Sequence, residues 1–86
     1  MAGAVIHLHA VAAPPRAQTH LDGCRFWAAA TEPHETLADV LAHLAAQIIA
    51  AGAPGSALAA VWMRGGPMHP PVPLAALAGN GGDSGP

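Results

Sequence analysis

The sequence contains no lysine and no tyrosine, only one cysteine and one phenylalanine, and few charged residues. Charged side chains make up 9% of the 86 residues, and Arg16, Arg25 and Arg64 are the only lysine or arginine cations. Proteins that bind nucleic acid carry a basic stripe that neutralises phosphates, and three arginines scattered along the chain do not provide one. We therefore expect no nucleic-acid partner.

A single cysteine, Cys24, excludes an intramolecular disulfide and gives no indication of an oxidising compartment. As a nucleophile it would need a basic neighbour such as Arg25 or His20, and its position in a predicted strand favours a packing role instead. The sequence also contains no nucleophile elbow and no phosphate-binding loop. These absences predict that the chain is not an enzyme.

Targeting and membrane signals are equally scarce. The first residues place no cationic stretch ahead of a long apolar run, so we expect no secretory signal. No segment reaches the roughly 18 uninterrupted apolar residues that a membrane helix requires. The sequence therefore predicts a cytoplasmic protein without a membrane partner.

What the sequence has in abundance is alanine, which makes up about a quarter of the chain and half of its 52% hydrophobic residues. Alanine favours helices but buries little area, so the core of such a short domain should be thin. The larger apolar side chains expected to fill it are Ile6, Leu8, Val11, Leu21, Phe26, Trp27, Leu37, Val40, Leu41, Leu44, Ile48, Leu58, Val61, Trp62, Leu74 and Leu77. The free energy gained by burying a core of this size roughly equals the conformational entropy lost on folding, which favours completion of the core by a second copy or a partner.

Two-residue alternation predicts a first strand over residues 4–12, with Ile6 and Leu8 on one face and His7 and His9 on the other. The prolines in residues 13–18 predict a hairpin loop. A second strand is expected over about 19–30, with a bulge or late turn at Asp22-Gly23.

The sequence predicts a helix that begins after Thr36, which has capping-box spacing to Asp39, and that ends at Gly52. Its apolar stripe comprises Leu37, Val40, Leu41, Leu44 and Ile48. Residues 56–64 predict a third strand, with a glycine turn after it. Residues 68–73 can hold at most a short edge segment, residues 74–78 fit one helical turn, and residues 79–86 form an expected flexible tail beyond a single domain of residues 1–78.

The stretches at residues 32–41, 59–66 and 73–77 resemble the corresponding parts of ubiquitin-like β-grasp domains. The resemblance implies an α+β fold of ββαβ type, with a mixed sheet and one helix on one face, recognised through its sheet face and without enzymatic activity. The family's last long strand has no counterpart after Leu77, so either the sheet is shorter or another chain fills the gap by β-augmentation. In some family members a Gly-Gly end is joined to a target, and Gly81-Gly82 would be the matching pair here.

The six histidines are the most distinctive reactive side chains of this short chain. His7 and His9 point the same way from the first strand, from where two imidazoles can reach one zinc or copper ion, with His20 or Cys24 as a third ligand. The alternative is that they are polar residues on an exposed strand face.

One helix covers only one side of a small sheet, so the other side should be the partner surface. The residues expected there are Val5, His7, His9, Val11, Arg25, Trp27, Trp62 and Arg64. Tryptophan and arginine are common interface anchors, although at least one tryptophan is expected to pack under the helix instead.

We therefore predict a protein-binding module without a cofactor, whose partner is another protein or a second copy of the chain. A histidine-based metal-binding or metal-carrier protein and a small accessory subunit of a larger enzyme are the alternatives.

Overall fold

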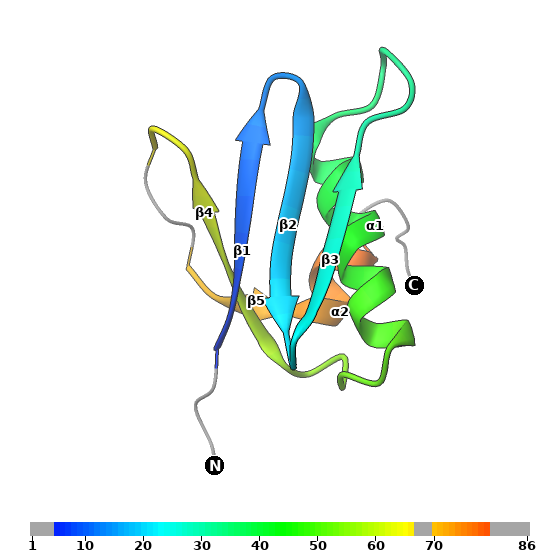
Figure 1. The fold of residues 1–86 in the computed structure, drawn as a ribbon, viewed down its shortest axis with the longest axis vertical. Helices are drawn as coiled ribbons and strands as arrows, with labels where there is room; N and C mark the ends of the chain where they lie inside the picture. Colours follow the sequence, from blue (N-terminus) through cyan, green and yellow to red (C-terminus); the bar gives the residue numbers. More distant parts are fainter. Residues whose placement is uncertain (1–4, 67–69, 80–86) are drawn as a thin grey trace.

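The computed structural model describes residues 5–66 and 70–79, which form a mixed five-stranded sheet with two helices (Figure 1). The predicted α+β class is confirmed. The elements are β1 (Val5–Ala12), β2 (Pro15–Leu21), β3 (Cys24–Ala29), α1 (Leu37–Ala50), β4 (Leu58–Met63), β5 (Val72–Pro73) and α2 (Leu74–Ala78).

The first hairpin is tighter than the sequence predicted. Residues 13–18 were expected to be a loop, but the turn comprises only Ala13-Pro14, and β2 begins at Pro15. A proline is tolerated as the first residue of a strand because it lacks only the N–H group. The carbonyl of Pro15 still accepts a hydrogen bond of 3.0 Å from the amide of Ala30.

The single strand expected over residues 19–30 is two antiparallel strands, β2 and β3, so that prediction was wrong in its bounds. They are joined at Asp22-Gly23, the site named as a bulge or late turn. Both residues have positive φ, 51° and 79°, as a two-residue hairpin turn whose twist matches its strands requires. Glycine adopts this conformation without steric cost, and aspartate is among the few other residues that tolerate it.

The strand order is β3-β2-β1-β4-β5, and β4 runs parallel to β1 after the crossover through α1. Val5 is paired with Leu58 and Ala10 with Met63, so β4 lies directly beside β1 along its length. The direct pairing of β1 with β4 leaves no gap between these two strands for a strand from another chain.

Helix α1 matches its prediction. The hydroxyl of Thr36 accepts from the Asp39 amide at 3.3 Å, and the Asp39 carboxylate accepts from the Thr36 amide at 2.9 Å. These bonds, first from the Thr36 amide and then from its hydroxyl, hold the pKa of Asp39 below its usual value. The helix ends at Ala51, followed by Gly52 with a φ of 122°.

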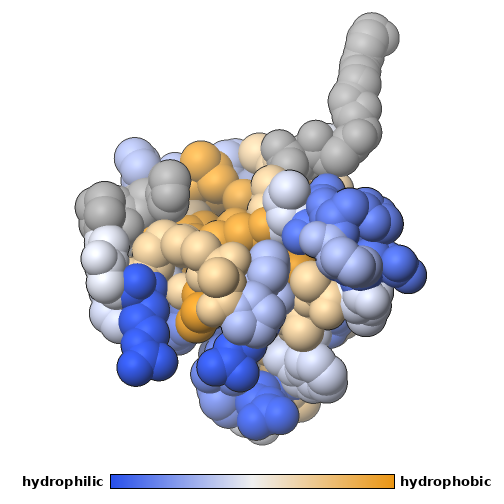
Figure 2. Space-filling view, turned by 90° about the horizontal axis from the view of Figure 1, so that it is seen from above, coloured by the Kyte–Doolittle hydropathy of each residue, from blue (hydrophilic) through white to orange (hydrophobic). Residues whose placement is uncertain are grey.

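The core lies between the sheet and the two helices, and alanines supply about half of it. Its fully buried large side chains are Leu8, Val40, Leu44, Ile48 and Leu74, and its small ones include Ala10, Ala17, Ala28, Ala45 and Ala59. Seen end-on, apolar residues form a band across the middle of the molecule with hydrophilic residues around it (Figure 2).

Three residues predicted for the core are outside it. Trp27 is 56% exposed, Trp62 42% and Leu58 40%, while Val11 is half-buried on the same side of the sheet. All four side chains point away from α1, because strand alternation places their neighbours in the core instead.

The end of the described chain seals one corner of the core. Val72 pairs with Ala59, and α2 places Leu74 fully in the interior, next to α1. The short edge segment and the helical turn predicted here are both present. The expected tail beyond Gly79, including Gly81 and Gly82, lies outside the described residues. Within the described residues, no helix is long and apolar enough to cross a membrane.

Candidate functional site

The sheet has two unlike faces, of which α1 and α2 cover one. We call the other the open face. Its side chains are those of Val5, His7, His9 and Val11 on β1, Arg16, Gln18 and His20 on β2, Arg25, Trp27 and Ala29 on β3, and Leu58, Ala60, Trp62 and Arg64 on and after β4.

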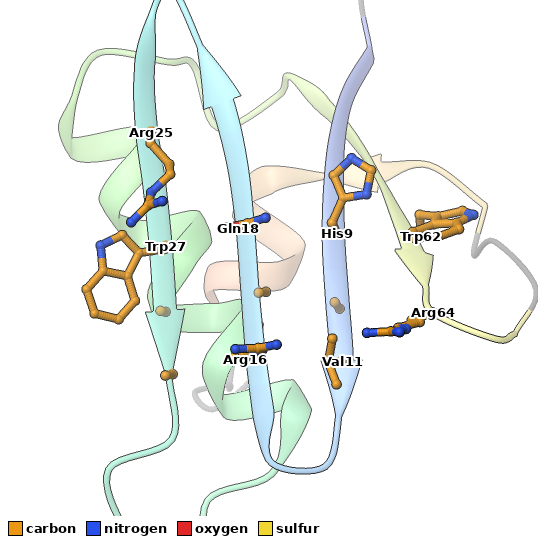
Figure 3. Close-up of a pocket in the computed structure, with 12 residues that line it drawn as sticks. His9, Val11, Arg16, Gln18, Arg25, Trp27, Trp62 and Arg64 are labelled. Carbon is orange, nitrogen blue, oxygen red and sulfur yellow. The ribbon is translucent and has the colours of Figure 1, made fainter.

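The open face holds a depression with a volume of about 540 Å³. Figure 3 shows that its labelled side chains come from four strands and project from the side of the sheet opposite α1. The larger side chains that line it are His9, Val11, Arg16, Gln18, Arg25, Trp27, Trp62 and Arg64. The remaining lining residues are Ala29, whose short side chain lies on the open face, and Ala10, Ala17 and Ala28, whose side chains are buried on the covered side of the sheet.

A single line of planar side chains crosses the open face at right angles to the strands. Trp27 is paired with Gln18, Gln18 with His9, and His9 with Trp62. We call these four residues the central row. Since neighbouring strands lie about 4.8 Å apart, the row spans roughly 14 Å from one tryptophan to the other.

At one end of the central row two rings are in contact, and at the other end a hydrogen bond anchors the strand backbone. The rings of His9 and Trp62 meet edge to face, with centroids 5.4 Å apart and planes at 70°, an arrangement that aromatic pairs favour. At the other end, the amide of Gln47 on α1 donates a hydrogen bond of 2.9 Å to the carbonyl of Trp27. The tryptophans are therefore exposed on a fixed scaffold, which lowers the entropy lost when a ligand covers them.

Arginines flank the central row on both sides. Arg16 pairs with Val11 and Ala29 on one side, and Arg64 follows β4 at the same level, where its amide bonds to Ala10. Arg25, paired with His20, lies on the other side. The three arginines, which are far apart in the sequence, thus lie on one face of the sheet, where Arg25 and Arg64 were expected and Arg16 was not.

The acidic residues lie elsewhere. None of Asp22, Glu32, Glu35 and Asp39 lines the depression, and Glu35 and Asp39 instead border a second depression on the helix side with His34 and His43. In the part of the chain that the structure describes, the open face is therefore the cationic side of a molecule whose formal net charge is −2.

The structure places all eight residues predicted for the partner surface on the open face, and six of them line the depression. Val5 and His7 lie further along β1, outside it. Arg16 and Gln18 were missed because Pro14-Pro15 indicated a loop. The alternation of polar residues at 16, 18 and 20 with Ala17 and Thr19 was the signal that a strand starts there.

The histidines proposed as metal ligands, His7, His9 and His20, also lie on the open face, whereas strand alternation points Cys24 the other way. Among the residues described, no group of three or more His, Cys, Asp or Glu side chains is placed to hold a metal ion. Cys24 is a free, exposed thiol. The geometry therefore gives the metal hypothesis no supporting observation.

Comparison with known proteins gives no relative: no family model, no curated protein and no solved structure matches this chain. The function must be argued from the open face itself.

Proposed function

We propose that this chain is a non-enzymatic protein-binding module that docks its partner on the open face. The observation that carries the proposal is the placement of both tryptophans, 56% and 42% exposed, on the sheet face that no helix covers. Water-exposed indole rings cost free energy that a partner recovers when it covers them, because each ring presents a large apolar surface.

The composition of the depression supports a binding rather than a catalytic role. Tryptophan and arginine are the residues most often found as energetic anchors of protein interfaces, and here they alternate along a rigid sheet. The described lining residues include no carboxylate, cysteine or serine that could act as nucleophile or general base beside His9.

A separate protein fits the open face better than a second copy of the chain. Two open faces meeting across a two-fold axis would bring the arginines of both copies together, with no carboxylate among the described lining residues to pair with them. Like charges brought together at an interface cost several kcal/mol. We therefore assign the open face to another protein.

Site-specific photocrosslinking in the producing cells tests this assignment. A photoreactive amino acid at Gln18, in the centre of the open face, should give a protein adduct of defined mass that resists nuclease and is removed by protease. The matched control carries the same group at Ala46, an exposed position on α1. Absence of an adduct from position 18, or equal adducts from both positions, would contradict the proposal.

A further inference from the structure

The open face concentrates the positive charge of a protein that is negative overall. All three arginines line one depression, on both sides of the central row, while the four acidic residues in the described part lie outside it. Such a separation of charge selects partners by sign, because it attracts anionic groups to the open face and repels them from the helix side.

The length of the central row limits the length of a ligand that can lie between the arginines. A span of roughly 14 Å corresponds to about four residues of extended peptide at 3.3 to 3.4 Å per residue. The indoles at the two ends offer apolar contact, and the amide of Gln18 between them offers two donors and one acceptor to a peptide backbone. Guanidinium groups to either side can bind carboxylates in bidentate fashion.

We infer that the open face binds an acidic, extended peptide segment of its partner. The segment lies across the strands over the central row, with an apolar residue against a tryptophan and its carboxylates on Arg16, Arg25 and Arg64. This inference deepens the proposed function and rests on it, since it names the chemistry of the segment that the open face receives.

A peptide fits these observations better than single-stranded nucleic acid, which also uses aromatic rings and arginines. Nucleic-acid affinity comes mainly from neutralising many phosphates, and three guanidiniums can neutralise only a few. A short acidic segment meets only the cationic side.

Both tryptophans of the chain lie on the open face, and there is no tyrosine, so tryptophan fluorescence reports binding at this site directly. The probe is the decapeptide Ac-(Asp-Glu-Leu-Glu-Asp)2-NH2, which has no aromatic residue. Its uncharged counterpart is Ac-(Asn-Gln-Leu-Gln-Asn)2-NH2, and an oligothymidylate of the same length represents nucleic acid. Each is titrated into the full chain at about 0.15 M salt, where only close charges interact strongly.

We expect the acidic decapeptide to change the fluorescence in a saturable way and to bind at least about tenfold more tightly than the uncharged one. The variant Arg16→Gln/Arg25→Gln/Arg64→Gln should lose about tenfold or more in affinity for the acidic probe. The variant Ala38→Glu/Ala46→Glu/Ala50→Glu adds the same net charge change at exposed sites of α1 and should change the affinity less than about threefold. Thermal unfolding of each variant verifies that it is folded.

Three results would overturn the inference: no saturable response to the acidic probe, equal affinity for the charged and uncharged peptides, or tighter binding of the oligothymidylate. The crosslink at position 18 distinguishes these three results from a failure of the proposed protein-binding function. A protein adduct there combined with an inert acidic probe leaves the protein-binding role standing and removes the acidic segment. Loss of the adduct removes the protein-binding role itself.

Discussion

The covered and open faces of this sheet are built from the same strands, yet they distribute side-chain size in opposite ways. On β4, Ala59 and Val61 are buried towards the helices, while Trp62, between Val61 and Met63, is 42% exposed on the other side. On β3, Ala28 is buried and Trp27 is exposed. The largest side chains of the protein thus lie outside its core.

The difference shows that in this alanine-rich chain small side chains line much of the core while the tryptophans lie outside it. Alanines on the covered face let α1 approach the sheet closely, so a few leucines and isoleucines suffice to fill the remaining space. Both indole rings are exposed on the open face instead. Substitutions on the covered face should therefore change folding, and substitutions on the open face should change binding.

The largest effect should come from Leu44→Ala, which empties a fully buried position of α1. We expect the free energy of unfolding to fall by about 2 to 5 kcal/mol, the usual cost of a cavity in a close-packed core. Chemical denaturation of both proteins measures it.

The matched truncation on the open face is Trp62→Ala. It removes more atoms, but the ring is already partly hydrated and its main contact is the edge-to-face pair with His9, so we expect a loss below about 1.5 kcal/mol. If Trp62→Ala destabilised the protein as much as Leu44→Ala, the division between the two faces would be wrong.

Overpacking tests the same division in the opposite direction. Ala59→Leu adds volume where the covered face has none to spare and should cost about 1 to 3 kcal/mol of stability. Ala29→Leu adds the same volume to the lining of the open depression and should change stability by about 0.5 kcal/mol or less. Equal losses in denaturation experiments would show that the alanines of the two faces are equally confined.

Local signals accounted for much of this fold. The capping box of Thr36 and Asp39, the apolar stripe of α1 and the turn residues Asp22-Gly23 each act within a few residues, and each is where the sequence indicated. The bounds of β2 were predicted wrongly because Pro15 was taken to exclude a strand. A proline excludes a strand only at a position where the ladder needs its N–H group as a hydrogen-bond donor. At the first position of the strand it is not needed.

The sequence placed both tryptophans on the expected partner surface but also expected at least one of them under the helix, and that second expectation was wrong. Hydrophobicity alone places an indole in the core, whereas the alanines that bring α1 close to the sheet leave no room for one. The grouping of the arginines likewise depended on pairing: Arg16 and Arg25 lie in β2 and β3, Arg64 directly follows β4, and the three share one face only through the sheet register. A linear reading recovers which residues share a strand face but not which strands adjoin.

A smaller effect is expected from the one buried polar side chain among the described residues. The hydroxyl of Thr19 on the covered face donates a hydrogen bond of 2.7 Å to the carbonyl of His7, joining β2 to β1. Thr19→Val keeps the shape but leaves that carbonyl without this donor, so stability should fall by about 1 kcal/mol. The control Thr31→Val removes an exposed hydroxyl that donates to Glu35 at 2.9 Å, and should cost less than about 0.5 kcal/mol. An equal cost for the two substitutions would show that burial on the covered face adds nothing to this bond.

The smallest effect concerns the acidic side of the molecule and its dependence on pH. The pKa of Asp39 is lowered in the folded state first by the hydrogen bond from the Thr36 amide and then by the one from the Thr36 hydroxyl. Desolvation, the next largest effect, raises this pKa, and the charges of His43 and His34 make smaller contributions that lower it. A carboxyl with a lowered folded-state pKa stabilises the fold above its unfolded-state pKa of about 4, and this contribution disappears as the pH falls through the folded-state value.

Asp39→Asn keeps an oxygen acceptor for the cap but cannot titrate, so its unfolding free energy should decline less than that of the original protein between about pH 5 and pH 3. Glu32→Gln removes another exposed carboxyl near the start of α1 and should leave the decline largely unchanged. Identical pH profiles for Asp39→Asn and the original protein would mean that the capping carboxylate contributes no charge-dependent stability.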